Sequence, residues 1–540
     1  MDDADKTSDI AISGVPLVPG FDRSIRTLTW IKVCLYVAAL STIACWALGI
    51  WAHVTGIEHL AVSFEGHEYS REAILFVVSL LVTFTNDALG YVHTIALRWA
   101  LYREGRLEYN TNFRLFTSAR TSFANRWYMN LLSTCMLILS YGCSSLLLVR
   151  MFPYPRMDEF LHMEMGDFPT SPSIGVNAMA LMLLGLSLGV QALTALLCLR
   201  HHDTQIPTWS ASPLANTLTA LYGHSGLQHR PGRCMMSVTD LNSSPEARKP
   251  ASKQPSLWKM RHAKWIVVFL WSLCVASFVW AAMMVKVIND DDPEGFDFDW
   301  SQVNVTQGEN STQVVTFYMN PDQNIYGSDI TFSQSVQWIC AIMFLCVVQG
   351  VQAIGLHCVE LLVNMSRDEV LWQKARHERG ASIRSEPLFA ALTSWRTVVL
   401  TILKTVLHWL LGQSLVPFSF MVEDEPDQFV RGWFVFLISP SRLLLFAIVS
   451  AVTAAFTTLL AFWQIRSPQP AAWGNLQTLA DLVDDWRTID GNLWWGDKGN
   501  EDGTIRHAGT GYTPETVSKI DMEVYYAGTP RVGGKARKQP

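Results

Sequence analysis

The chain has 540 residues, of which 49% are hydrophobic and only 16% charged, and its formal net charge is −6. Because a soluble globular protein usually carries about 25% charged residues, this composition excludes an ordinary soluble domain, and we expect no nucleic-acid partner. Several apolar runs exceed about 18 residues, the length that predicts a transmembrane helix. The sequence therefore predicts an integral membrane protein whose immediate partner is the lipid bilayer.

The apolar runs predict an all-α membrane protein with about eight transmembrane helices. The segment before the first run is acidic and lacks a cleavable signal peptide, so we expect that run to act as a signal anchor. The predicted spans are residues 28–52, 73–97, 127–150, 174–199, 263–288, 335–363, 397–417 and 441–463.

The spans and the loops between them suggest five segments. These are a cytosolic N-terminal tail (1–27), a first four-helix half with the amphipathic segment that follows it (28–223), a flexible basic cytosolic linker (224–262), a second four-helix half (263–463) with an acidic loop at 289–334, and a cytosolic C-terminal tail with an amphipathic helix (464–540).

Loop charges predict the orientation of the chain. The loops 98–126, 200–262 and 364–396 are rich in Arg and Lys, whereas the loops between them are acidic. The excess of positive charge on cytoplasmic loops then puts both termini in the cytosol. The basic loops and the tail together form a predicted cytosolic layer.

The acidic loop 289–334 supports this orientation independently. It contains two N-glycosylation sequons, at Asn304 and Asn310, and no Lys or Arg. A sequon is glycosylated only on the lumenal side, so these sites predict a glycoprotein in the plasma membrane or another secretory-pathway membrane. A third sequon, at Asn242, falls on the cytosolic side and is expected to stay unmodified.

The tail contains the string WGNLQTLADLVDDW (473–486), with leucines at helical spacing and an acidic face formed by Asp481, Asp484 and Asp485. This pattern predicts an amphipathic helix. Because anionic lipid would repel the acidic face, we expect the helix to dock on basic cytosolic elements, either loop 98–126 or the segment that follows IPTWSASPL.

Short matches between the halves suggest a tandem 4+4 parallel repeat. Gly90-Tyr91-Val92-His93 resembles Gly355-Leu356-His357, FTSAR (116–120) resembles LTSWR (392–396), and Pro207-Thr208-Trp209 resembles Pro470-Ala471-Ala472-Trp473. Because four spans is an even number, both halves would share one orientation, with a pseudo-two-fold axis along the membrane normal.

Polar side chains inside the spans are the candidate functional residues, because charge at membrane depth is costly. Glu360 lies seven residues before Arg367 and Lys404 eight residues after Arg396, so in antiparallel helices these two side chains share a depth and are able to form an ion pair. The candidates are Asn86, Asp87 and His93 in the second span, Gln349, Gln352, His357 and Glu360 in the sixth, and Lys404 and His408 in the seventh.

These residues allow two interpretations. They either hydrogen-bond between helices as structural contacts, each worth about 0.6–2 kcal/mol, or handle protons or cations between the two halves, as in transporter cores. Known catalytic motifs such as GxSxG, HExxH or a Walker A loop do not occur, and the sequence offers no Cys/His cluster typical of a metal site. We therefore expect no enzyme activity, no catalytic residue, no metal and no cofactor.

Several strings are shared with a known group. They are NDALGYVHTIALRWALYREGRLEYNTNFRLFTSAR, IPTWSASPL, GLHCVELLVNMSRDE, WGNLQTLADLVDDW with LWWGDKG, and RHAGTG, and they extend through most of the chain. In these strings the chain resembles a group of large fungal polytopic membrane proteins of unknown function. The resemblance implies a membrane location and a fungal source, and it supplies no catalytic residues.

The functional expectation is a structural, sensing or scaffold component of a membrane, with a homo-oligomeric or protein partner bound through the cytosolic loops. The alternative is a transporter or channel that uses the polar residues of the second, sixth and seventh spans. A continuous polar path between the halves would favour the alternative, and a closed bundle would favour the scaffold.

Overall fold

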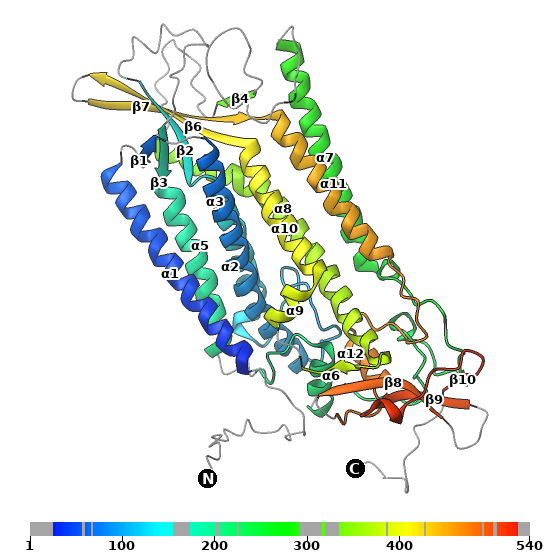
Figure 1. Cartoon of the computed structure of the whole chain (residues 1–540). Coiled ribbons are helices and arrows are strands. Elements are labelled where there is room, and N and C mark those ends of the chain that lie inside the picture. The colour runs from blue at the N-terminus through cyan, green and yellow to red at the C-terminus, as the bar shows by residue number, and fades with distance from the viewer. Residues whose placement is uncertain are drawn as a thin grey trace.

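The computed structural model describes residues 25–56, 60–65, 68–154, 173–200, 206–223, 226–291, 298, 315–318, 334–384, 387–425, 428–488, 491–499 and 505–527. The fold is mostly helical, with long helices that lie between two small sheets at opposite ends (Figure 1). The predicted glycosylation sites Asn304 and Asn310 lie outside the described residues.

Eight long helices form the body of the molecule, in two sets of four along the chain. The first set is α1 (Ile25–Thr55), α2 (Glu68–Arg103), α3 (Trp127–Ser145) and α5 (Ala178–Arg200). The second set is α7 (Arg261–Asp291), α8 (Gln334–Gln373), α10 (Trp395–Ser414) and α11 (Pro440–Phe462).

Six of these helices, α1, α2, α5, α7, α8 and α11, are long and apolar enough to cross a membrane. The other two, α3 and α10, have 19 and 20 residues and lie alongside the six (Figure 1). Exposed apolar side chains, such as Leu40 in α1 and Val347 in α8, face outward from the body. An apolar exterior of this kind is what the lipid-facing side of a helix requires.

The two sets of helices pack in corresponding ways. In the first set α1 packs along α5, and in the second set α7 packs along α11. Between the sets, α2 packs on α10 while α3 packs on α8. The centre of the molecule is therefore formed by α2, α3, α8 and α10, and the candidate polar residues lie on three of these helices.

A six-stranded sheet, which was not predicted from the sequence, covers one end of the helices. Its strand order is β1-β3-β2-β6-β7-β4. The strands are β1 (Leu60–Glu65), β2 (Leu148–Tyr154), β3 (Ser173–Asn177), β4 (Val315–Tyr318), β6 (Leu415–Glu425) and β7 (Gln428–Ile438). Strand β2 follows α3 of the first set and pairs in parallel with β6, which follows α10 of the second set, so the sheet joins the two sets.

Three predicted spans consequently included strand residues. The span 174–199 began too early, because residues 174–177 belong to β3 and α5 begins at Ala178. Helix α10 ends at Ser414 and β6 begins at Leu415, whereas the prediction extended the helix to residue 417. Helix α3 ends at Ser145, five residues before the predicted end at residue 150. Hydrophobicity alone does not separate a short buried strand from the end of a helix, so an all-α prediction was only partly correct.

The opposite end carries a layer built from residues 98–126, 206–223, 226–262, 364–384, 387–396, 464–488, 491–499 and 505–527, which we call the loop–tail layer. It contains a four-stranded sheet in the order β10-β9-β8-β5. Its helices and strands are α6 (Pro213–Tyr222), β5 (Ala381–Ser382), α9 (Pro387–Thr393), α12 (Leu476–Leu482), β8 (Asn492–Gly499), β9 (Ile505–Gly511) and β10 (Tyr525–Tyr526), with short 3-10 turns at η1 (Phe123–Asn125), η3 (Val238–Asp240), η4 (Leu257–Lys259), η5 (Lys374–Arg376) and η6 (Pro514–Thr516).

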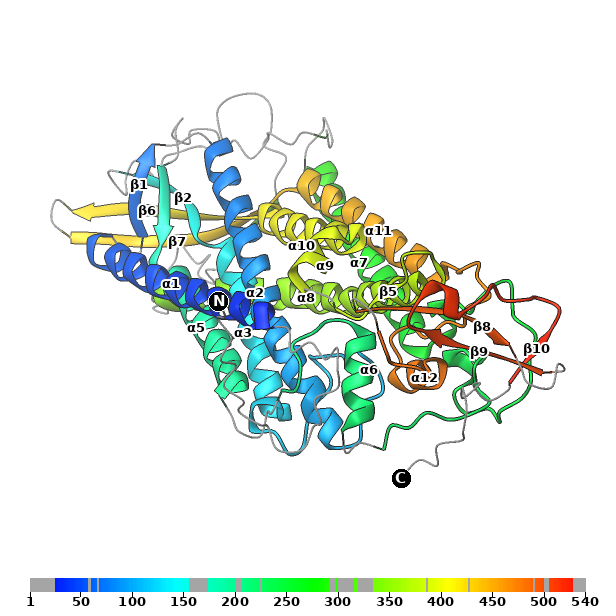
Figure 2. The same cartoon turned by 60° about the horizontal axis from the view of Figure 1, so that its bottom comes forward.

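The tail helix docks where its sequence predicts. Helix α12 packs on α6, which follows IPTWSASPL, and the two lie together in the layer (Figure 2). It also contacts loop 98–126, because the Leu476 amide donates to the Glu108 carbonyl at 2.9 Å. The helix is shorter than the predicted 473–486, however: it ends at Leu482, and Val483 is extended.

Residues 226–262, which belong to the expected flexible linker, are packed into the layer. The Val238 amide donates to the Ala471 carbonyl and the Gln254 amide to the Ile465 carbonyl, both at 2.9 Å. Arg230 and Arg233 each form an ion pair with Asp481 of α12. The basic composition of this segment therefore serves contacts with the acidic tail, in addition to its exposure to solvent.

Candidate functional site: a charged cluster among three helices

The central polar cluster is organised around Lys404 on α10. Its ammonium nitrogen lies 2.9 Å from Asp87 Oδ1 on α2 and 2.9 Å from Glu360 Oε2 on α8. The Lys404 side chain is only 2% exposed, whereas the two carboxylates are more accessible. The Glu360–Lys404 pair is the one that their equal depth predicts, and Asp87 joins it from the first set of helices.

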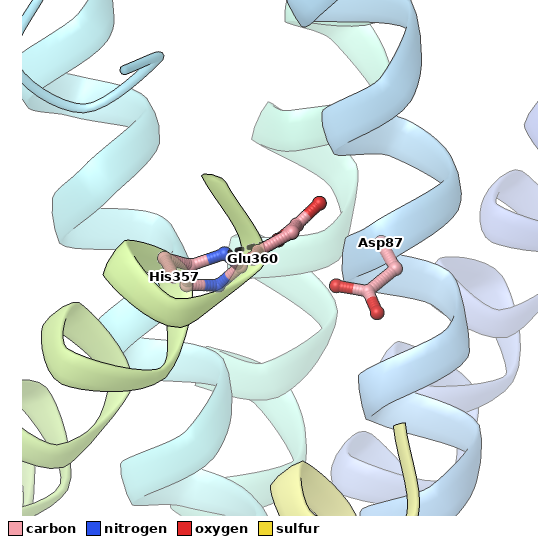
Figure 3. A group of neighbouring side chains, drawn as sticks. All are labelled: Asp87, His357 and Glu360. Carbon is pink, nitrogen blue, oxygen red and sulfur yellow. Dashed lines mark hydrogen bonds and ion pairs between the residues drawn. The ribbon is translucent and has the colours of Figure 1, made fainter. Parts of the chain in front are cut away.

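His357 completes the cluster one helical turn from Glu360. Its Nδ1 lies 3.0 Å from Glu360 Oε2, and Figure 3 shows both side chains reaching from α8 toward Asp87 on α2. One ligand atom from each of Asp87, His357 and Glu360 lies within 4.8 Å of the others, a spacing that also suits a metal ion.

The charges already present argue against a resident metal ion at this position. Lys404 contacts both carboxylates and so takes the place that a cation would occupy. A second cationic group, Arg114, lies near enough to interact electrostatically with both carboxylates. Two positive and two negative side chains balance, and adding a divalent ion to this setting would leave uncompensated charge in a medium of low dielectric constant.

Arg114 reaches the cluster from the loop–tail layer because position 90 is a glycine. The guanidinium group of Arg114 lies directly against Gly90, and a Cβ atom at that position would overlap it. Gly90 is one helical turn beyond Asp87 on α2. The glycine therefore gives a basic loop residue access to a carboxylate within the helical body.

A small cavity of about 50 Å³ adjoins the cluster. A site needs about 10–15 Å³ of such volume to hold one water, so the cavity has room for a few waters, whereas sites for organic ligands usually measure about 300–1,000 Å³. It lies between α2, α8 and the loop–tail residues 111–116, and its lining includes Asp87, Gly90, Arg114, His357, Glu360 and Asn364.

A tightly packed polar layer lies beyond the cluster, toward the six-stranded sheet. The rings of Tyr141 and His408 stack at a centroid distance of 3.6 Å. His408 Nδ1 lies 2.7 Å from Gln349 Oε1, and Gln349 Nε2 donates to Ser145 Oγ at 3.1 Å.

Close helix contacts continue above this layer. A Cβ at Gly142 of α3 would lie 2.6 Å from Cys346 Sγ of α8, and a Cβ at Gly412 of α10 would lie 2.7 Å from Ser145 Oγ of α3. These contacts separate the cavity from the sheet-covered end of the molecule.

The remaining candidate residues lie outside this cluster. Asn86 faces the first set of helices, where it donates to Ser140 Oγ and accepts from Gln191 Nε2. His93 and Gln352 are buried on α2 and α8, and neither is among the residues that line the cavity. Asn86 also lines the cavity, although its hydrogen bonds go to other helices of the first set. The charged cluster itself consists of Asp87, His357, Glu360 and Lys404.

Two groups that matter to the site were not predicted from the sequence. Arg114 is one of six arginines in a basic loop, and its spacing does not distinguish it from the others. The second group lies nearer the six-stranded sheet, where Arg442 of α11 and Glu72 of α2 form a buried ion pair at 2.6 Å. Arg442 is at the beginning of an apolar run, a position that predicts an exposed helix end.

Comparisons with protein-family models, curated proteins and solved structures find no match. The class of protein therefore rests on the fold itself. Six helices long and apolar enough to cross a bilayer, with apolar side chains on their outer surfaces, are the features of an integral membrane protein.

Proposed function

We propose that this protein is an eight-span membrane scaffold or sensor, in which the two sets of helices form one fixed body and the loop–tail layer presents a cytosolic surface to partners. The observation that carries the proposal is the set of contacts that ties the two sets together at every depth. A transporter that alternates between two states needs its halves to move against each other.

Four contacts between the sets support a fixed body. At the sheet-covered end, β2 pairs with β6, and Glu72 pairs with Arg442. At mid-depth, Asp87 pairs with Lys404. In the loop–tail layer, Asn110 donates to Asp368 Oδ2 of α8 at 2.8 Å. Because both ends and the middle are joined, opening one end would break buried polar contacts.

The proposed orientation places the loop–tail layer in the cytosol and both termini with it. The basic loops belong to this layer, in agreement with the excess of positive charge on cytoplasmic loops. Exposed tryptophans lie at this end of the helices, as expected at either membrane boundary, where side chains meet lipid headgroups. They are Trp30, Trp127, Trp265 and Trp395, with exposures of 52%, 67%, 64% and 58%.

A parallel 4+4 repeat is part of the proposal, and two pairs of contacts support it. The Trp99 indole of α2 donates to the Thr208 carbonyl at 3.0 Å, and the Trp372 indole of α8 donates to the Pro470 carbonyl at 2.8 Å. Each accepting segment leads into a short helix with a side-chain cap: Ser212 begins α6 and Asn475 begins α12. By these contacts α8 is the counterpart of α2 in the second half. The Pro-Ala-Ala-Trp segment is likewise the counterpart of the Pro-Thr-Trp segment.

A transporter or channel is the second candidate, and one observation favours it. The water-sized cavity reaches Asp87 and Glu360 from the side of the loop–tail layer, so protons or small cations have access to the cluster. The close packing beyond Tyr141 and His408 favours the fixed scaffold over this candidate.

Distance measurements between spin labels test the two candidates. One pair, at Tyr36 and Val268, reports on the helix ends near the loop–tail layer, and a second pair, at Val54 and Met283, reports on the opposite ends; all four side chains are exposed. We expect one narrow distance distribution for each pair, unchanged between pH 5.5 and pH 8. Two populations that shift in opposite directions at the two ends would contradict the fixed body and support transport.

A further inference from the structure

A basic pocket lies just beyond the loop–tail ends of α7 and α11, separate from the central cluster. Its cavity volume is about 340 Å³, within the range of small-ligand sites. One wall is formed by residues 248–259, which lead into α7, and the other includes Gln464 and Pro468, which follow α11. The pocket is therefore framed by the chain at the ends of two packed helices.

Four cationic side chains line this pocket, and two of them form no ion pair with the described residues. Arg248 pairs with Asp240 at 3.0 Å, and Lys249 pairs with Glu523 at 3.1 Å. Lys253 and Lys259 are exposed, and neither forms an ion pair within the described part of the chain. Two lysines with free ammonium groups beside a concave surface suit a ligand with more than one negative group, such as phosphates.

The position of the pocket along the helix axes indicates whether a phosphate ligand would come from a lipid or from solution. Lys259 is two residues before the start of α7, and Gln464 is two residues after the end of α11. Trp258 stacks on Phe462 at 4.4 Å, and Trp265 on the first turns of α7 is 64% exposed. Because exposed tryptophans lie at the boundary between hydrocarbon and water, the pocket lies at the depth of lipid headgroups.

We propose that this pocket binds the headgroup of an anionic lipid that carries phosphomonoesters, such as a polyphosphorylated phosphatidylinositol. Lys253 and Lys259 bind the headgroup phosphates, while the acyl chains lie against the apolar surface formed by α7 and α11. Basic pockets at the cytoplasmic ends of membrane helices are suited to such headgroups. The choice of a cytoplasmic-leaflet lipid rests on the proposed orientation, whereas binding itself does not.

The test uses the full-length protein in phosphatidylcholine nanodiscs, which expose both faces of the membrane. A fluorescent short-chain phosphatidylinositol 4,5-bisphosphate is titrated, and its anisotropy is measured. We compare Lys253→Gln/Lys259→Gln with the control Lys374→Gln/Arg379→Gln, which removes two exposed charges elsewhere in the same layer. We expect the first pair to weaken binding by about tenfold or more, because each lysine near the phosphates contributes about 1 kcal/mol, and the control by less than about twofold.

Three outcomes would overturn the proposal. The first is an absence of saturable binding to the wild-type protein. The second is equal weakening by both double variants, which would indicate general attraction to a basic surface. The third is complete displacement of the probe by millimolar inorganic phosphate, which would identify a site for soluble phosphate. All four substituted side chains are exposed, so thermal unfolding of both variants should match the wild type and serves as the check on folding.

Discussion

The ammonium group of Lys404 lies 2.9 Å from the carboxylate of Asp87, a residue 317 positions earlier in the chain. This contact joins α10 of the second set of helices to α2 of the first at the centre of the body. The same ammonium group contacts Glu360 of α8, so one cation neutralises carboxylates from two helices. A cation in this position joins three helices through its contacts with the two carboxylates.

Replacing Lys404 should therefore destabilise the protein strongly. Lys404→Met removes the shared cation and leaves Asp87 and Glu360 facing each other. Removing one partner of a buried ion pair costs about 3–5 kcal/mol. We therefore expect a large fall in protein level and in melting temperature in detergent. Lys286→Met, at an exposed lysine of α7, is the control and should change little. A melting temperature for Lys404→Met equal to that of the control would contradict the role of this cation.

Substitutions at Asp87 distinguish a structural role of this residue from a role in proton transfer. Asp87→Asn keeps the shape and an oxygen that accepts from Lys404, so folding and abundance should survive. Asp87→Leu removes one of the two partners of Lys404 and should reduce abundance. In proteoliposomes with a pH-sensitive dye inside, we expect no proton flux from the wild type or from Asp87→Asn. A wild-type flux that Asp87→Asn abolishes at normal abundance would favour the transporter.

The positions of the helices were predictable from the lengths of the apolar runs. One contact of the cluster was predictable from the rise per residue of an α-helix. Glu360 and Lys404 occupy similar depths counted from the basic loops, and depth alone made their pairing reasonable. The docking of the tail helix followed from its acidic face and leucine spacing. These features depend on local sequence, which a single chain displays directly.

Other features depend on how distant segments meet. Asp87 joins Lys404 because of the rotation of α2 about its own axis, which the sequence does not fix. Arg114 reaches the cluster because its loop folds back over Gly90. Residues 415–417, the first of β6, were predicted as the end of a helix, since the pairing of β6 with β2 involves residues far along the chain. Residues 226–262 likewise take a defined conformation because the tail packs against them.

Gly474 should be intolerant of substitution. Its φ of 73° lies in the left-handed region, and an added Cβ would lie 2.8 Å from Asp368 Oδ2. A left-handed conformation costs a residue with a Cβ about 1–2 kcal/mol, and the contact adds to this cost. We expect Gly474→Ala to lower the melting temperature clearly. Gly226→Ala, at a site with open space around it, is the control and should have almost no effect.

The tail should lose stability as the pH rises above 6.5. Burial opposes a charged imidazole at His507, but its hydrogen bond to Asp484 raises the pKa to about 9 from an ordinary value of 6.5. A group whose pKa is raised by folding contributes its stability below the unfolded value and loses it as the pH passes the folded value. The loss is on the order of 2–3 kcal/mol between pH 6.5 and pH 9.

Thermal unfolding of the wild type and His507→Gln at pH 6.5 and pH 9 checks this prediction. The wild type should melt at a lower temperature at pH 9, while His507→Gln should be nearly independent of pH over this interval. His377→Gln, at an exposed histidine, is the control and should retain the wild-type dependence. An unchanged pH dependence in His507→Gln would show that another group is responsible.

The orientation of the chain predicts which sequons are modified. The proposed orientation, with both termini in the cytosol, puts the loop that contains Asn304 and Asn310 on the lumenal side, where N-glycosylation occurs. Endoglycosidase treatment of the protein from a eukaryotic host should increase its gel mobility, and Asn304→Gln/Asn310→Gln should abolish that change. Asn242→Gln should have no effect, because Asn242 belongs to the loop–tail layer. A mobility change that survives the double substitution and disappears with Asn242→Gln would reverse the proposed orientation, because the basic layer would then face the lumen.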